Sequence, residues 1–71
     1  MSTISTPEQL GALVRERRKA SGLNQKRLAA LAGVGTRFLS ELERGKPTAQ
    51  LGKTLHVLQL LGLEVQITKR K

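Results

Sequence analysis

The chain contains no cysteine, tryptophan or tyrosine, and Phe38 is its one aromatic residue. Without cysteine there is no disulfide, thiolate metal site or thiol nucleophile, and His56 alone cannot hold a metal without a second strong ligand. No apolar run approaches the ~20 residues that span a bilayer. The N-terminus lacks a basic start followed by an apolar core, so we expect no secretory signal and a cytoplasmic protein. A single aromatic residue also argues against stacking of RNA bases on an aromatic platform.

Acidic residues are scarce, and this imbalance indicates the kind of partner. Five glutamates and no aspartate stand against 13 lysines and arginines, a formal net charge of +8 over 71 residues. A single small domain with this excess is expected to meet a polyanion. A core of this size rarely leaves more than ~3–5 kcal/mol of net stability, so oligomerisation is the remaining way to gain more. No nucleophile–base arrangement can be assembled, so we expect neither an enzyme nor a cofactor.

Glycines at positions 22, 33, 45 and 62 each follow a helix-like stretch and predict four short helices. The first begins after the N-cap Thr6, with Pro7 at its first position and Gln9 completing a capping box. The second spans residues 25–32 after the N-cap Asn24. The others span residues 36–44 and a stretch that begins at Thr48 and stops before Gly62. These breaks argue against the one long amphipathic segment of a membrane-active cationic helix. Apolar spacing predicts core positions in the last three helices: Leu28, Leu31 and Ala32; Leu39 and Leu42; Leu51, Leu55, Leu58 and Leu61.

Residues 63–68 alternate apolar and polar side chains with a period of two, which favours a strand. The pattern offers no second strand, and an unpaired strand leaves its backbone donors and acceptors unsatisfied. We therefore expect this strand to pair with its copy across a two-fold axis, with Leu63, Val65 and Ile67 at the dimer contact. Residues 6–62 form the domain proper, whereas residues 1–5 and the basic tail 69–71 are expected to be mobile.

The second and third predicted helices, joined by residues 33–35, form a helix-turn-helix pattern. Leu39 and Leu42 mark the buried side of the third helix, so its opposite side can lie in a major groove of DNA. Around this side we expect the DNA contacts, which are Asn24, Gln25, Lys26, Thr36, Arg37, Ser40, Glu41, Arg44 and Lys46.

The residue types suggest different roles on the DNA. Arg37 has the fork that binds guanine O6 and N7. Gln25, with the backbone N–H groups near Asn24, forms a phosphate clamp at a helix N-terminus, and the two lysines are further phosphate contacts. Thr36 and Ser40 suit a base edge or a phosphate. For Glu41 two roles are equally open, as an acceptor from cytosine or as an ion-pair partner of a neighbouring cation.

The order of these motifs resembles the phage-repressor (Cro/C1, or XRE) helix-turn-helix family over about residues 7–62. The residues that carry the resemblance are Leu23-Asn24-Gln25 with Leu28-Ala29, then Ala32-Gly33-Val34, then Leu39-Ser40 with Leu42-Glu43-Arg44-Gly45. The family implies an all-α, compact four-helix, lambda-repressor-like domain. It also implies a partly buried salt bridge between Arg18 and Glu43 that ties the first helix to the third. The chain departs from the family at Gly35, where Ser or Thr commonly caps the recognition helix.

The run from Gly45-Lys46-Pro47-Thr48 to Leu61-Gly62-Leu63-Glu64-Val65 is similar to HipB-type antitoxins. Those are small dimeric repressors whose C-terminal strands pair across the dimer. The resemblance implies a HipA-type serine/threonine kinase toxin as protein partner and autoregulation of a shared operon. The alternative is a stand-alone repressor without a toxin. Either is expected to bind a double-stranded DNA operator as a homodimer.

Overall fold

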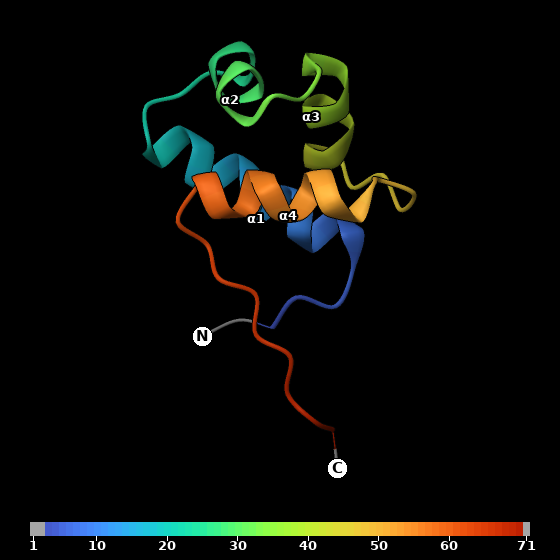
Figure 1. The fold of residues 1–71 in the computed structure, drawn as a ribbon. Coiled ribbons are helices and arrows are strands. Elements are labelled where there is room, and N and C mark those ends of the chain that lie inside the picture. Colours follow the sequence, from blue (N-terminus) through green and yellow to red (C-terminus); the bar gives the residue numbers. More distant parts are fainter. Residues whose placement is uncertain (1–2, 71) are drawn as a thin grey trace.

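The computed structural model describes residues 3–70, and its regular structure consists of four helices (Figure 1). They are α1 (Pro7–Ala20), α2 (Gln25–Ala32), α3 (Thr36–Glu43) and α4 (Leu51–Leu60). The all-α class and the order of the four helices confirm the prediction. The mobile ends expected at residues 1–2 and at residue 71 lie outside the described residues.

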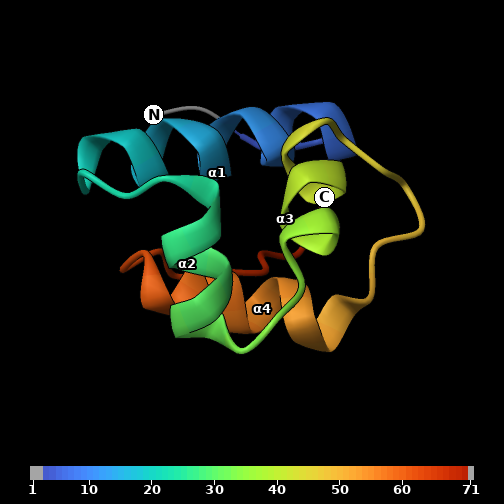
Figure 2. The ribbon, with the colours of Figure 1, turned by 90° about the horizontal axis from the view of Figure 1, so that it is seen from above.

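The helices enclose one small core. α1 and α4 lie on two sides of the molecule, with α2 and α3 between them (Figure 2). α3 packs against α1 and α2, and α2 packs against α4. The segments that precede α1 and follow α4 extend from the side opposite α2 and α3 (Figure 1). The outer side of α3 is therefore left free of other elements.

The ends of α1 and α2 follow the predicted capping chemistry. The side chain of Thr6 accepts a hydrogen bond from the N–H of Gln9 at 3.1 Å, and Gln9 Oε1 accepts from the N–H of Thr6 at 3.3 Å. Asn24 Oδ1 accepts from the N–H of Arg27 at 2.7 Å. These bonds satisfy donors that a helix N-terminus otherwise leaves unpaired.

Nine buried apolar side chains form the core: Val14, Leu28, Ala29, Ala32, Leu39, Leu42, Val57, Leu58 and Leu61. All four helices or their caps contribute to it. Full burial of one Val or Leu side chain contributes ~1.5–3 kcal/mol. Partly buried apolar side chains pack against this core and enlarge it: Leu10, Leu23, Val34, Phe38, Ala49 and Leu63.

α1 lies directly on the last turn of α3. A Cβ atom at Gly11 would lie 2.4 Å from the carbonyl O of Leu42 and 2.6 Å from that of Glu43. No side chain fits between these two backbones, so glycine is required at position 11. The backbone just after α3 also lies close to the start of α1. A Cβ at Gly45, whose φ is 89°, would lie 2.8 Å from Cα of Glu8.

α4 departs from the prediction at its start. It begins at Leu51, with Gln50 as N-cap, and not at Thr48. Gln50 makes no side-chain capping bond, and its carbonyl O accepts from the hydroxyl of Thr54 at 2.7 Å. Residues 46–50 form the turn that carries the chain from α3 to α4. α3 is also one residue shorter than predicted, because Arg44 is its C-cap.

The predicted apolar stripe of α4 was partly wrong. Leu58 and Leu61 are buried, but Leu51 is 70% exposed and Leu55 is 39% exposed. At about 100° per residue, the buried side of α4 is rotated from the leucine stripe toward Thr54 and Val57, so the first two leucines lie at its edge. In α2, Leu31 was also expected in the core and is 53% exposed, because it lies on the side that faces away from α3 and α4.

The segment after α4 is extended and, within residues 3–70, belongs to no strand. Leu63 is half-buried against the core, whereas Val65 is 53% and Ile67 is 94% exposed. Because a strand needs a partner, pairing of residues 63–68 across a dimer stays a prediction.

Candidate nucleic-acid interface

The turn between α2 and α3 sets the angle between them. Gly33 adopts the left-handed conformation, with φ 67° and ψ 30°, and its N–H donates to the carbonyl O of Ala30 at 3.3 Å. The N–H of Val34 donates to the carbonyl O of Ala29 at 3.0 Å. The small side chain of Ala29 is 2% exposed and allows close packing at this point. α2 and α3 thus form the helix-turn-helix that the sequence predicted.

α3 divides sharply into a buried and an outer side. Leu39 and Leu42 are 0% and 3% exposed. The polar residues of α3 and its C-cap that were expected to contact DNA lie outside the core: Thr36, Arg37 and Arg44 are exposed, and Ser40 and Glu41 are half-buried. The arrangement offers cations, hydroxyls and one carboxylate along a single rigid helix.

Glu41 pairs with two cations on this outer side. Its Oε1 accepts a hydrogen bond from Nζ of Lys46 at 3.2 Å, and its Oε2 lies 3.6 Å from Nε of Arg37. The backbone N–H of Lys46 also donates to the carbonyl O of Glu41 at 3.0 Å. The hydrogen bond from Lys46, together with the charges of Lys46 and Arg37, holds the pKa of Glu41 below its ordinary value of 4.5. Of the two roles open for Glu41, the free protein adopts the ion pair.

Gln25, at the first position of α2, does not point freely to solvent. Its Nε2 donates to Oε1 of Glu43 at 3.0 Å. An ionised carboxylate only accepts, so the amide must turn its nitrogen toward Glu43. A phosphate contact at this helix end therefore uses the second N–H of the amide or the backbone donors of the first turn. The neighbouring Lys26 is exposed. The bond between Gln25 and Glu43 joins α2 to α3 and was not predicted.

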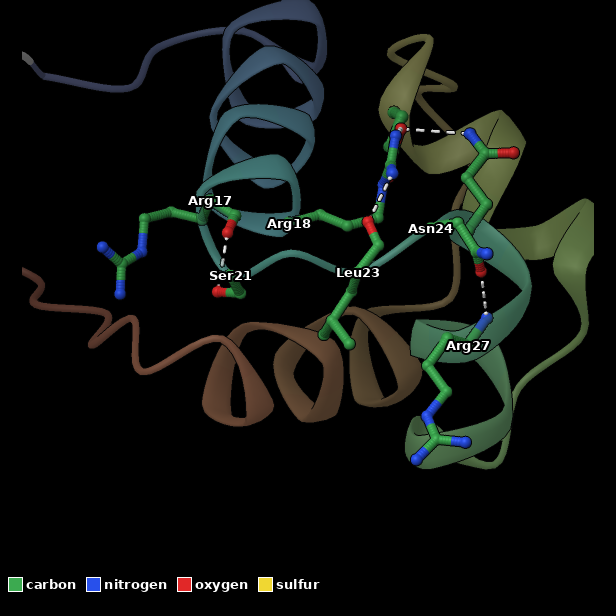
Figure 3. A network of polar contacts seen from close by, with 8 residues as sticks. Arg17, Arg18, Ser21, Leu23, Asn24 and Arg27 are labelled. Carbon is green, nitrogen blue, oxygen red and sulfur yellow. Dashed lines mark hydrogen bonds and ion pairs between the residues drawn. The ribbon is translucent and has the colours of Figure 1, made fainter.

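Glu43 also meets Arg18 of α1, and this buried pair joins three helices. Figure 3 shows Arg18 reaching from α1 to Leu23, just before α2. Nε of Arg18 donates to Oε2 of Glu43 at 2.7 Å, and its second guanidinium nitrogen donates to Oε1 at 3.1 Å. A third nitrogen donates to the carbonyl O of Leu23 at 2.9 Å, just before α2. The two side chains are 9% and 3% exposed. The pairing fixes the inclination of α3 relative to α1.

A shallow hollow between α1, α2 and α3 is lined by Arg15, Arg18, Gln25, Ser40, Glu43 and Arg44. Arg15 was not among the DNA contacts expected from the sequence. The structure places it at this hollow, beside Ser40 and Arg44 of the outer side of α3. Only the packing of α1 on α3 brings these residues together, so their spacing in the sequence does not reveal that Arg15 lies near α3. Arg15 joins the candidates for a phosphate contact.

A second, apolar surface lies along α4 and the segment that follows. Leu55, Leu60, Val65 and Ile67 are 39–94% exposed. Leu55, Leu58, Leu63 and Val65 line a hollow between α4 and this segment, together with Gln59, Gly62 and Glu64. A guanidinium nitrogen of Arg17 donates to the carbonyl O of Leu61 at 3.1 Å and fastens the end of α4 to α1. His56 is exposed on the same helix.

Two further properties concern residues 3–70 only. No group of three His, Cys, Asp or Glu side chains in this part of the chain lies together in a way that would hold a metal ion. None of its helices has the length and apolar character needed to cross a membrane.

Comparison with known proteins identifies the class. A family model described as a helix-turn-helix domain matches residues 9–67. An uncharacterised HTH-type transcriptional regulator of Sinorhizobium fredii strain NGR234, y4mF, is 58% identical over 64 residues, which are 90% of this chain and 84% of that protein. The chain therefore belongs to the XRE-type helix-turn-helix family of transcriptional regulators.

Solved structures similar to this chain include several of HipB. A complex of HipB with an O4 20mer superimposes with a TM-score of 0.87 at 25% identity, covering 100% of both chains. A HipA–HipB–O2–O3 complex gives a TM-score of 0.88, also at 25% identity and with full coverage of both chains. The likeness thus includes the residues after α4.

Proposed function

We propose that this protein is a sequence-specific transcriptional repressor that binds its operator as a homodimer, with α3 in the major groove. The observation that carries the proposal is the division of α3. Leu39 and Leu42 are buried at 0% and 3% exposure, and the opposite side holds polar groups that suit base edges and phosphates. The net charge of +8 supplies salt-dependent affinity for DNA.

The residues of this surface divide into two proposed roles. Arg37, whose side chain is 90% exposed, reads a guanine, with Thr36 and Ser40 at neighbouring base edges or phosphates. Phosphates are bound around the rim by Lys26, Arg44, Lys46, Arg15 and the first turn of α2 at Asn24 and Gln25. In a dimer the two copies of α3 meet half-sites about 34–36 Å apart or a multiple of that distance.

The apolar surface of α4 and residues 63–68 supports the dimer. The side chain of Ile67 is 94% exposed in the single chain, and the backbone of this extended segment has no partner strand within residues 3–70. Pairing with a second copy covers Val65 and Ile67 and satisfies the backbone groups at once.

We further propose that the protein is a HipB-like antitoxin, which neutralises a HipA-like serine/threonine kinase toxin and represses their shared operon. Support comes from the full-length likeness to HipB, including HipB in a complex with HipA. The alternative is a regulator without a toxin, and the name of the 58% identical relative mentions only transcriptional regulation. The gene beside this one separates the two: a kinase-like product that copurifies with this protein supports the antitoxin, and its absence supports the stand-alone regulator.

Arg37→Ala tests the DNA role. Operator duplexes are first selected by the wild type from random sequences, and affinity is then measured by fluorescence anisotropy. We expect the variant to lose ~1–3 kcal/mol of binding free energy and to relax one position of the selected site. Lys19→Ala, on the exposed end of α1, removes the same charge and is the control. An unchanged footprint and affinity in Arg37→Ala would contradict the assignment.

Ile67→Glu tests the dimer. The side chain is already exposed in the single chain, so the substitution leaves the fold intact but places a charge in the proposed strand pair. Gln66→Glu, whose side chain alternates to the other face, is the matched control. Sedimentation should show a weakened dimer for the first variant alone. Two equally stable dimers would refute the strand pairing.

A further inference from the structure

Glu41 is an acidic side chain on the outer side of α3, between two cations that the proposed function assigns to DNA. Its carboxylate lies 3.6 Å from Nε of Arg37 and 3.2 Å from Nζ of Lys46. The other glutamate of α3, Glu43, is buried beneath this surface and paired with Arg18. A half-buried carboxylate on a surface proposed to meet a polyanion requires an explanation.

In the free protein Glu41 holds both cations in place. Lys46 is fixed twice, through its side chain and through its backbone N–H, which donates to the carbonyl O of Glu41 at 3.0 Å. The turn that follows α3 is thereby fastened to the helix. The side chain of Arg37 touches Glu41 at one end and is otherwise 90% exposed. The three side chains carry a net charge of +1 where the two cations alone would carry +2.

DNA changes the surroundings of this carboxylate. An ionised carboxylate accepts hydrogen bonds and donates none. Phosphate oxygens, guanine N7 and O6 and thymine O4 are acceptors as well, and they oppose a carboxylate that faces them. Each base pair also presents one amino group in the major groove, adenine N6 or cytosine N4, but its position across the groove differs from pair to pair. A carboxylate held at one point on α3 therefore meets a donor at some sequences and an acceptor at others.

We propose that Glu41 determines specificity by exclusion: it opposes the binding of Arg37 and Lys46 to arbitrary DNA and is accommodated only where a base amino group faces it. This inference rests on the proposed placement of α3 in the major groove. It assigns discrimination to a penalty against wrong sequences, in addition to the attraction of Arg37 for the right one.

Glu41→Gln provides the test, because glutamine keeps the shape and an acceptor, removes the charge and adds a donor. Glu16→Gln, on the exposed surface of α1, changes the net charge by the same amount and is the matched control. The probes are a duplex selected by the wild type from a random-sequence pool and the unselected pool itself. Anisotropy titrations at several salt concentrations measure both affinities, and thermal melting by circular dichroism verifies the fold. Glu41→Ser replaces the glutamine variant if that variant melts early.

We expect Glu41→Gln to bind the unselected pool roughly three- to tenfold more tightly, with less than about a twofold gain on the selected duplex. Glu16→Gln should change both affinities by one common factor. Equal factors for the two probes in Glu41→Gln would overturn the proposal and leave only general electrostatics. If the wild type enriches no sequence at all, the proposed function itself fails; if it enriches one and the ratio of affinities is unchanged in the variant, only the role of Glu41 fails.

Discussion

Arg18→Met is expected to destabilise the protein more than any exposed charge substitution. It removes three hydrogen bonds at once, two to Glu43 and one to the carbonyl O of Leu23. Glu43, 3% exposed at its side chain, then keeps a carboxylate charge with Gln25 as its remaining partner. Removal of one partner from a buried ion pair costs ~3–5 kcal/mol, because the other charge stays buried and uncompensated.

This loss is large beside the total stability. A core of this size leaves only ~3–5 kcal/mol of net unfolding free energy for the single chain. We therefore expect Arg18→Met to lose most of it and to populate unfolded chains at 25 °C. Urea titrations followed by circular dichroism measure the difference, with the protomer concentration held constant because dimerisation shifts the transition.

Two further variants make the measurement decisive. Arg15→Met, on the exposed side of α1, should stay within about 0.5 kcal/mol of the wild type. Arg18→Met combined with Glu43→Leu removes both charges, and we expect it to recover most of the loss, since apolar replacements of a buried pair are often neutral. An Arg18→Met variant as stable as Arg15→Met would refute the view that this pair supports the fold.

Three more predictions concern single contacts. Gly11→Ala should lower the free energy of unfolding by more than ~2 kcal/mol, as overpacking of a core does, because its Cβ would meet the backbone oxygens of α3. Gly52→Ala, whose Cβ has no atom within 4 Å, should instead stabilise α4 by ~0.5–1 kcal/mol. Urea titration measures both changes. An NMR titration should give Glu41 a pKa below 4.5 that rises toward 4.5 in Lys46→Gln, and an unchanged pKa in the variant would contradict the pairing. Because the pKa is lowered in the folded state, the ion pair stabilises the fold above pH 4.5, and this stabilisation is lost as the pH falls through the folded pKa. Gly35→Ser should raise the free energy of unfolding by ~0.5–1 kcal/mol, because a serine hydroxyl can cap α3. The φ of Gly35 is −73° and no atom lies within 4 Å of the new Cβ, so serine fits without strain. A lower melting temperature would count against this.

Local signals predicted the helices well. Thr6 and Asn24 cap α1 and α2 as the sequence indicated, and the left-handed glycines stand where the helices end. These features depend on residues within one turn of each other, so the sequence alone reveals them. The start of α4 was missed because Gln50 caps it through its backbone conformation without a side-chain hydrogen bond.

Contacts between helices were harder to predict. The leucines of α4 serve two surfaces, and their spacing alone does not tell which are buried: Leu58 is in the core and Leu55 at its edge. The bonds from Gln25 to Glu43 and from Lys46 to Glu41 depend on how α2 and the turn after α3 pack, which no periodicity encodes. The division of α3 into a buried and an outer side could be predicted, because it needed only the helical repeat.

The contact of α1 with α3 runs from backbone to backbone at Gly11, and the ion pair of Arg18 and Glu43 braces it from beneath. Neither involves Thr36, Arg37 or Ser40. Side chains on the outer side of α3 can therefore be exchanged without loss of the contacts that set its tilt. Under the proposed function, this makes the domain a suitable starting point for changing the DNA sequence that α3 selects.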